Sequence, residues 1–207
     1  MKDLFYGICA GVLIGIGGAV FLASENRVIG AVLFSVALIC ICAKGYSLYT
    51  GKVGYLAFSH RAGDVKNLAF CFLGNLVGTF AAGNAIHFSQ SALYEKAGAL
   101  CETKLTQSVP SALIRAVFCG ILMYLAVSVY REKNTFIGIL FCVPVFILAG
   151  FEHSIADLFY FFAAGHYSFT AAGYLMLIVL GNSVGGLLFP VLSRLAEPHK
   201  HTQGEAK

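Results

Sequence analysis

Residues 149–157 of the chain read AGFEHSIAD, and this stretch decides how the rest of the sequence is interpreted. It interrupts a run that is otherwise apolar, from Phe136 to Ala149 on one side and from Ile155 to Ala164 on the other. A charged side chain at the middle of a bilayer costs about 2.5–3.5 kcal/mol, whereas one Leu or Phe returns only about 0.3–0.6 kcal/mol. The acids and the histidine of this stretch should therefore line a cavity or pack against protein.

The composition is that of a polytopic membrane protein. The chain has 207 residues, of which 58% are hydrophobic and 12% charged, and its mean hydropathy is +0.80. No basic run with interleaved aromatic residues suggests a nucleic-acid partner. The seven cysteines form no CxxC pair, and six lie in apolar runs, where free Cys behaves as a small hydrophobe. We expect no cofactor.

The apolar runs predict an all-α membrane protein with six transmembrane helices, since about 20 residues cross the hydrocarbon core. The run near the N-terminus has glycines that offer a small face for close helix contact. The residues Gln90–Gln107 and His60–Asn67 are read as loops. The six predicted spans are Leu4–Ala23, Val28–Phe58 with a break at residues 44–51, Leu68–His87, Pro110–Tyr130, Phe136–Ala164 with the break described above, and Ala171–Leu192.

The sequence repeats itself. LGNLVG at 73–78 recurs as LGNSVG at 180–185, and the same offset places Phe34 on Phe141 and Gly45 on Glu152. Three spans in each half force the halves into opposite orientation, and broken helices in matching places of an inverted repeat point to a substrate site near the midplane. We expect one transmembrane domain over residues 1–207, with repeats at about 1–94 and 105–195 and a cytoplasmic tail at 196–207.

The distribution of basic residues predicts the orientation. Six spans place both termini on one side, and nine Lys or Arg lie there against three on the other side. The positive-inside rule then directs both termini of this multi-pass protein toward the cytoplasm of a cell membrane. The nine are Lys2, Lys52, Arg61, Lys66, Arg131, Lys133, Arg194, Lys200 and Lys207, and the three are Arg27, Lys96 and Lys104.

The two breaks contain the residues whose side chains could bind an anion or transfer a proton. Thr50 and Ser154 have hydroxyls suited to cap the restarted helices, whose N-terminal ends would favour an anion. His153 titrates near neutral pH when unperturbed, so it is a candidate proton donor, with a purely structural histidine as the alternative. We expect Glu152 to satisfy backbone groups of the break. Asp157, four residues after the histidine, would fix its tautomer.

Three basic residues lie in or beside the apolar runs. Lys104, just before the fourth span, is either a contact for an anion or an ordinary interfacial lysine. Lys44 lies beside the first break and is a candidate partner for Glu152 or Asp157. Arg115 is a candidate headgroup or inter-subunit contact. A metal site is disfavoured, because only one histidine lies near the acids.

GFEHSIAD, LYTG at 48–51, the two LGNxVG motifs and the six-span plan resemble the formate/nitrite transporter family over essentially the whole chain. The resemblance implies an aquaporin-like fold, a homopentamer with one pore per subunit, and permeation by small monovalent anions. We further expect this permeation to be linked to protons through His153. The resemblance also implies that His153 is the central pore histidine and Thr50 its partner, with Lys104 in the vestibule. The apolar constrictions implied in this way are Phe34, Leu38, Leu48, Met123 and Phe146, and the supporting residues are Glu152, Ser154, Asp157, Lys44, Asn75 and Asn182.

Four positions depart from the family pattern. The family commonly has Asn at the positions of Gly120 and Asp157 and an acid at that of Ser47, and Lys44 is atypical. A pore contact is therefore expected to be missing at Gly120. We predict a small-anion channel or transporter, not an enzyme. The alternatives are a neutral-solute channel for water or glycerol, an intramembrane metal-dependent enzyme, and a structural membrane scaffold.

Overall fold

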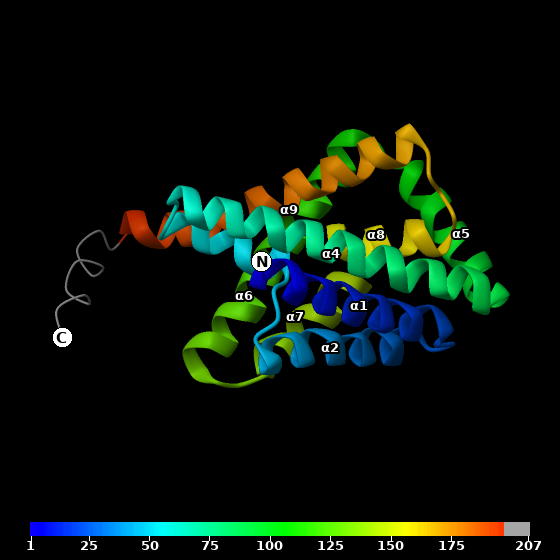
Figure 1. Ribbon diagram of the computed structural model, residues 1–207, viewed down its shortest axis with the longest axis horizontal. Coiled ribbons are helices and arrows are strands. Elements are labelled where there is room, and N and C mark those ends of the chain that lie inside the picture. Colours follow the sequence, from blue (N-terminus) through cyan, green and yellow to red (C-terminus); the bar gives the residue numbers. More distant parts are fainter. Residues whose placement is uncertain (197–207) are drawn as a thin grey trace.

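The computed structural model describes residues 1–196, and every regular element in this range is a helix (Figure 1). Two apolar segments are interrupted, one between α2 and α3 and the other between α7 and α8. The helices are α1 (Lys2–Ala23), α2 (Arg27–Lys44), α3 (Tyr49–Lys52), the 3₁₀ turn η1 (Val53–Ala57), α4 (Ala62–Ser89), α5 (Ser91–Leu105), α6 (Val109–Lys133), α7 (Ile137–Leu148), α8 (Ser154–Ala163) and α9 (Phe169–Ala196).

Five of these helices are long and apolar enough to cross a membrane, namely α1, α2, α4, α6 and α9. The helices α7 and α8 are apolar but have only 12 and 10 residues. Large hydrophobic side chains on the outside of the bundle, such as Phe5, Val36, Phe80 and Leu180, are about half exposed. Such a surface suits lipid and not water, in agreement with a multi-pass membrane protein.

Close helix contacts hold the bundle together. The main pairs are α1 with α4 and α6 with α9. A Cβ added at Gly7 would lie 3.0 Å from the Cα of Gly74, and one at Gly11 would lie 2.9 Å from the Cα of Gly78. The backbones of α1 and α4 therefore touch through small residues, as the glycines of the first span predict.

The prediction of a loop over Gln90–Gln107 is wrong. Residues Ser91–Leu105 form α5, which buries Leu93, Ala97, Cys101 and Lys104. These residues recur every three or four positions and line one helix face, but polar residues between them lower the mean hydropathy of the segment. The loop predicted over His60–Asn67 is also shorter, because α4 begins at Ala62.

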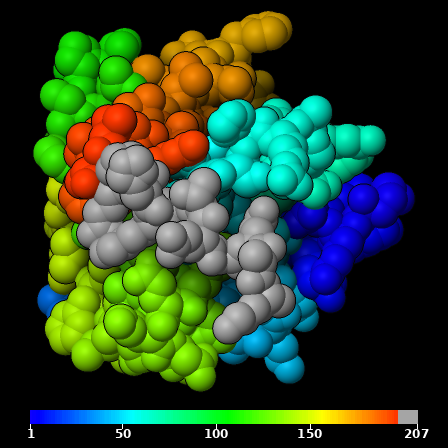
Figure 2. All heavy atoms as spheres, turned by 90° about the vertical axis from the view of Figure 1, so that its left-hand side faces the viewer, coloured from blue at the N-terminus to red at the C-terminus, as the bar shows by residue number. Residues whose placement is uncertain are grey.

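Apart from the two interruptions, the turns between helices lie toward two opposite ends of the molecule. At one end the start of α4, the turn from α6 to α7 and the end of α9 come together, and Figure 2 looks onto that end. At the other end lie the turns from α1 to α2, from α4 to α5 and from α8 to α9 (Figure 1). The predicted tail at 196–207 lies outside the described residues, apart from Ala196.

Candidate functional site

Two apolar segments stop and restart inside the bundle, as the sequence predicts. The chain leaves α2 at Gly45, which has φ +67°, and leaves α7 at Gly150, which has φ +71°. Glycine occupies this left-handed region without the steric cost of a Cβ, so both positions suit the end of a helix. Three extended or turn residues then precede the first residues of α3 and α8.

The asparagine of the first LGNxVG motif bonds to the first break. The side-chain oxygen of Asn75 accepts the backbone N–H of Tyr49 at 2.8 Å. Its Nδ2 donates to the carbonyls of Gly7 at 2.9 Å and Ser47 at 2.8 Å. One fully buried amide thus satisfies two backbone groups of the break, at Tyr49 and Ser47, that lipid would leave unpaired, and its bond to Gly7 attaches the break to α1.

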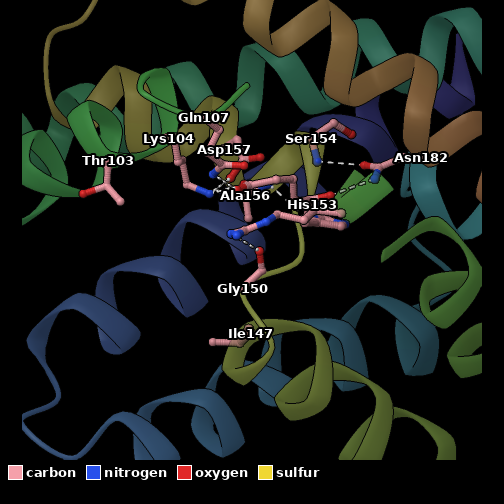
Figure 3. A network of polar contacts seen from close by, with 12 residues as sticks. Thr103, Lys104, Gln107, Ile147, Gly150, His153, Ser154, Ala156, Asp157 and Asn182 are labelled. Atoms are coloured by element: carbon pink, nitrogen blue, oxygen red, sulfur yellow. Dashed lines mark hydrogen bonds and ion pairs between the residues drawn. The ribbon is translucent and has the colours of Figure 1, made fainter. Parts of the chain in front are cut away.

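The asparagine of the second motif does the same at the second break. The side-chain oxygen of Asn182 accepts the backbone N–H of Ser154 at 2.8 Å. Its Nδ2 donates to the carbonyls of Ala116 and Glu152, each at 2.8 Å. Figure 3 shows this amide reaching across to the break. The two motifs therefore hold the restarted helices α3 and α8 by matching hydrogen bonds.

The predicted caps at these helices are wrong. The residues at the N-cap positions are Leu48 for α3 and His153 for α8, whereas Thr50 lies inside α3 and Ser154 is the first residue of α8. The asparagine amides and the histidine ring accept the N–H groups that the two hydroxyls were expected to accept. Hydroxyl residues at a helix start are a common signature, but here acceptors from elsewhere in the bundle replace them.

The hydrogen bonds also change the register of the two breaks. Ser47 and Glu152 both offer their carbonyl to the motif asparagine, so these two residues correspond. Gly45, which the constant offset placed on Glu152, corresponds to Gly150 by its left-handed backbone instead. The number of residues between the break and the LGNxVG motif differs between the two halves. One constant offset therefore cannot align both the motifs and the breaks.

His153 joins the two breaks. Its Nε2 lies 2.8 Å from the Oγ1 of Thr50, and its Nδ1 accepts the backbone N–H of Ala156 at 3.1 Å. Because Nδ1 is the acceptor, a neutral ring carries its proton on Nε2 and donates it to Thr50. The ring stacks on Phe146 with centroids 5.5 Å apart and is 2% exposed.

A buried polar cluster lies next to this histidine (Figure 3). The Nζ of Lys104 contacts Oε2 of Glu152 and Oδ1 of Asp157, the latter at 2.9 Å. Gln107 donates from Nε2 to Oε1 of Glu152 at 2.6 Å. All three charged side chains are at most 10% exposed. One lysine from α5 therefore holds two carboxyl groups from the second break and α8.

The cluster corrects two expectations about the acids. The side chain of Glu152 bonds to Lys104 and Gln107, while Asn182 satisfies the backbone of the break. The tautomer of His153 is set by the N–H of Ala156, not by Asp157. Lys44 is exposed at the end of α2, and the salt bridges of both acids are to Lys104.

Two cavities approach the break residues from different sides. One of about 270 Å³ is lined by His153 and by the cluster, together with Phe146, Arg27 and Arg115. Another, of about 130 Å³, is lined by Leu38, Leu48, Gly51, Lys52 and Arg131. We refer to them as the histidine cavity and the lysine-52 cavity. Thr50 bonds to His153 of the histidine cavity and directly precedes Gly51, which lines the lysine-52 cavity.

The five predicted constriction residues are all buried, with exposures of 1–3%. Phe34 packs edge-on against Phe146 at a centroid distance of 6.2 Å. Phe146 lines the histidine cavity, and Leu38 and Leu48 line the lysine-52 cavity. Apolar side chains thus line both cavities.

Two further positions depart from expectation. A Cβ at Gly120 would lie 2.3 Å from the backbone oxygen of Asn182, so this position serves the contact of α6 with α9. The pore contact expected to be missing at Gly120 stays a prediction, and the position has a packing role in addition. At Ser47, the hydroxyl donates to Asp3 at 2.8 Å, and Lys52 donates to both. An acid from α1 thus stands beside the residue at which the family commonly has one.

Some site residues were not identified from the sequence. Gln107 lies within the loop predicted over Gln90–Gln107, and Arg27 enters the predictions only through its charge. The periodic apolar residues of α5 would have placed Lys104 and Gln107 on one helix and its end. Asn75 and Asn182 were named only as supporting residues, although a buried amide repeated in both halves is a signal for backbone capping. Within the described residues, no three His, Cys, Asp or Glu side chains are grouped so that they could hold a metal ion.

A bundle of membrane helices with a buried polar site between two interrupted helices is the architecture of membrane transport proteins. The family model described as "Formate/nitrite transporter" matches residues 1–196, and the chain belongs to this family. The family is one of transporters and channels, not of enzymes.

The relatives agree with this assignment. The chain is 28% identical to "Nitrite transporter NirC" of Salmonella typhimurium over 87% of its length and 77% of that protein. It is 32% identical to "Uncharacterized transporter YrhG" of Bacillus subtilis over 86% of its length and 74% of that protein. A solved structure described as "Pentameric formate channel with formate bound" superposes with a TM-score of 0.78 at 23% identity, covering 94% of this chain and 96% of that one. A second, described as "FNT family ion channel", has a TM-score of 0.76 at 22% identity, with 94% and 88% covered.

Proposed function

We propose that the protein is a channel or transporter for small monovalent anions of the formate or nitrite type. The observation that carries this proposal is the position of His153. Its ring lines a cavity with two arginines and a lysine, and it is bonded to Thr50 on the other interrupted segment. The family and the transport activities for which its members are named supply the substrate class.

The proposed architecture is six spans in an inverted three-plus-three arrangement, with α7 and α8 together forming the fifth. The matching bonds of Asn75 and Asn182 support it, because each motif asparagine caps the restarted helix of its own half. We further propose an aquaporin-like fold, a homopentamer, and both termini in the cytoplasm of a cell membrane. The pentameric neighbour and the distribution of Lys and Arg support these assignments.

Anion recruitment is assigned to the cations of the histidine cavity. Lys104 lines this cavity, but its charge is offset by Glu152 and Asp157. Arg27 and Arg115 bond only weakly to backbone carbonyls, at 3.3 and 3.4 Å. At an effective dielectric of about 20, a unit charge 4 Å away is worth about 4 kcal/mol. We therefore propose that these two arginines concentrate the anion, whereas Lys104 holds the two acids.

Passage beyond His153 is proposed to require a neutral species. Removing an ion from water costs several kcal/mol even after the protein relaxes, and the buried rings of Phe34 and Phe146 cannot offset that cost. A proton that reaches the anion at His153, directly or through water, lets the neutral acid pass Leu38, Leu48 and Met123. The N-terminal end of α8 adds a favourable dipole, whereas α3 is only four residues long and contributes little.

The test is a panel of anion fluxes in liposomes between about pH 5 and 8, with and without a proton gradient. We expect formate or nitrite uptake that is coupled to inward proton movement and is lost in His153→Phe. Arg194→Gln is the control, because Arg194 bonds to the carbonyl of Ala57 at the other end of the bundle. Proton-coupled uptake that persists unchanged in His153→Phe refutes the role of the histidine. Osmotic swelling in neutral solutes without anion flux refutes the substrate class.

A further inference from the structure

The cluster around Lys104 contains one cation and two carboxyl groups. Lys104 is 8% exposed, Glu152 2% and Asp157 1%. Both carboxyl groups contact the same Nζ atom, so they lie within about two hydrogen-bond lengths of each other. With both acids ionised, the cluster would carry one surplus negative charge in a buried site.

In the part of the chain that the structure describes, both acids form their salt bridges with the same lysine, so no second cation pairs with Asp157. Its Oδ2 is buried and has no hydrogen-bond partner among the described residues. The other titratable groups around it are thiols and phenols from the packed helices, the imidazole of His153, and the two arginines of the histidine cavity. Arg27 is directed to the carbonyl of Ile147 and Arg115 to that of Gly150. The thiols and phenols are Cys101 of α5, Cys119 of α6, Tyr160 of α8 and Tyr174 of α9.

Two carboxyl groups that share a confined site cannot both ionise readily, and a buried unpaired charge takes up a proton instead. The pair then titrates as a unit. We propose that Glu152 and Asp157 together bind one proton, which makes the Lys104 cluster neutral, and that its loss makes the wall of the histidine cavity anionic.

The consequence for transport rests on the proposed function. An anion that enters the histidine cavity meets a neutral wall when the proton is bound and a negative wall when it is lost. Anion flux should therefore decrease as pH rises through the titration of the pair. A unit charge acting across several ångströms of partly screened protein changes the local anion concentration by about tenfold. This decrease adds to any proton coupling at His153.

Asp157→Asn isolates the effect of the shared proton on anion flux. Asn has the same shape and its side-chain oxygen can still accept from Lys104, so the variant leaves a neutral lysine–glutamate pair at every pH. We expect its flux to exceed that of the wild type at about pH 8 and to match it at about pH 5. Glu102→Gln is the matched control, because Glu102 is an exposed acid on the same helix as Lys104. An equal pH dependence in Asp157→Asn and the wild type would overturn the proposal.

Proton binding itself is measured without any transport. Infrared difference spectra of the purified wild type, recorded without added anion, should show the carbonyl band of a protonated carboxylic acid that persists above about pH 6. The band should shift on ¹³C labelling of aspartate or glutamate and be absent in Asp157→Asn but present in Glu102→Gln. The labelling experiment needs no variant to fold, and the chain has only three aspartates, Asp3, Asp64 and Asp157.

The infrared and flux measurements distinguish failure of the proton site from failure of the proposed function. A wild type without such a band overturns the proton site, whatever the flux. A band without any anion flux at all refutes the proposed function and leaves the proton site standing.

Discussion

Removing the amide of Asn182 is the sharpest test of how the second break is held. Asn182→Ala deletes one bond to the N–H of Ser154 and two to the carbonyls of Ala116 and Glu152, all at 2.8 Å in a fully buried position. Interhelical hydrogen bonds in membranes average about 0.6 kcal/mol and reach about 1.7. Three such bonds give a loss of about 2–5 kcal/mol.

The assay is thermal unfolding of the purified protein in detergent. For a chain of this size, each kcal/mol moves the midpoint by about 2–4 °C, so we expect a decrease of about 5–15 °C. Hydrogen exchange at the amide of Ser154 should accelerate as well, because its acceptor is gone. The second measurement locates the damage at the start of α8.

Asn84→Ala is the matched control. Asn84 is a part-buried asparagine of α4 that donates to Phe80 of its own helix and accepts from Tyr167. Its loss should move the midpoint by no more than a few degrees. If Asn182→Ala were as mild as Asn84→Ala, and if Ser154 exchanged at its wild-type rate, the capping role of the motif asparagine would be refuted.

Two further predictions concern packing and charge. Gly120→Ala should lower the unfolding midpoint by an amount equivalent to about 1–3 kcal/mol, since the new methyl group meets the backbone of Asn182 at 2.3 Å; an unchanged midpoint would show that α6 and α9 can separate freely. Lys104→Met should cost about 3–5 kcal/mol by leaving two buried carboxyl groups without their cation. The double variant Lys104→Met with Asp157→Asn should recover part of that lost stability. If the two changes in unfolding midpoint simply added, Lys104 and Asp157 would not be coupled.

The apolar runs and the two interruptions could be predicted because they depend on local composition. The acids and the histidine in residues 149–157 are too costly to face lipid, and Gly45 and Gly150 mark the positions where the backbone becomes left-handed. The glycines of α1 indicated a close contact, although its partner α4 became clear only from the structure.

The partners of the polar groups could not be predicted. Whether Thr50 or Asn75 satisfies the start of α3 depends on a helix that is remote in sequence. In the same way, Asp157 is one turn from His153, yet the stronger attraction of Lys104 on α5 directs its carboxyl group elsewhere. Local spacing describes which groups share a helix face, but competition among neighbouring helices decides which of them bond.

The bond between Thr50 and His153 has a mechanical consequence. It fastens the two interrupted segments to each other at 2.8 Å, and Asn75 and Asn182 anchor each segment to its own half. If one half rotated against the other, this hydrogen bond would break and the N–H of a buried imidazole would be left without an acceptor. Gating by rotation of the rings of Phe34 and Phe146 leaves this hydrogen bond intact. The arrangement therefore favours a rigid backbone with moving side chains over a carrier whose two halves move.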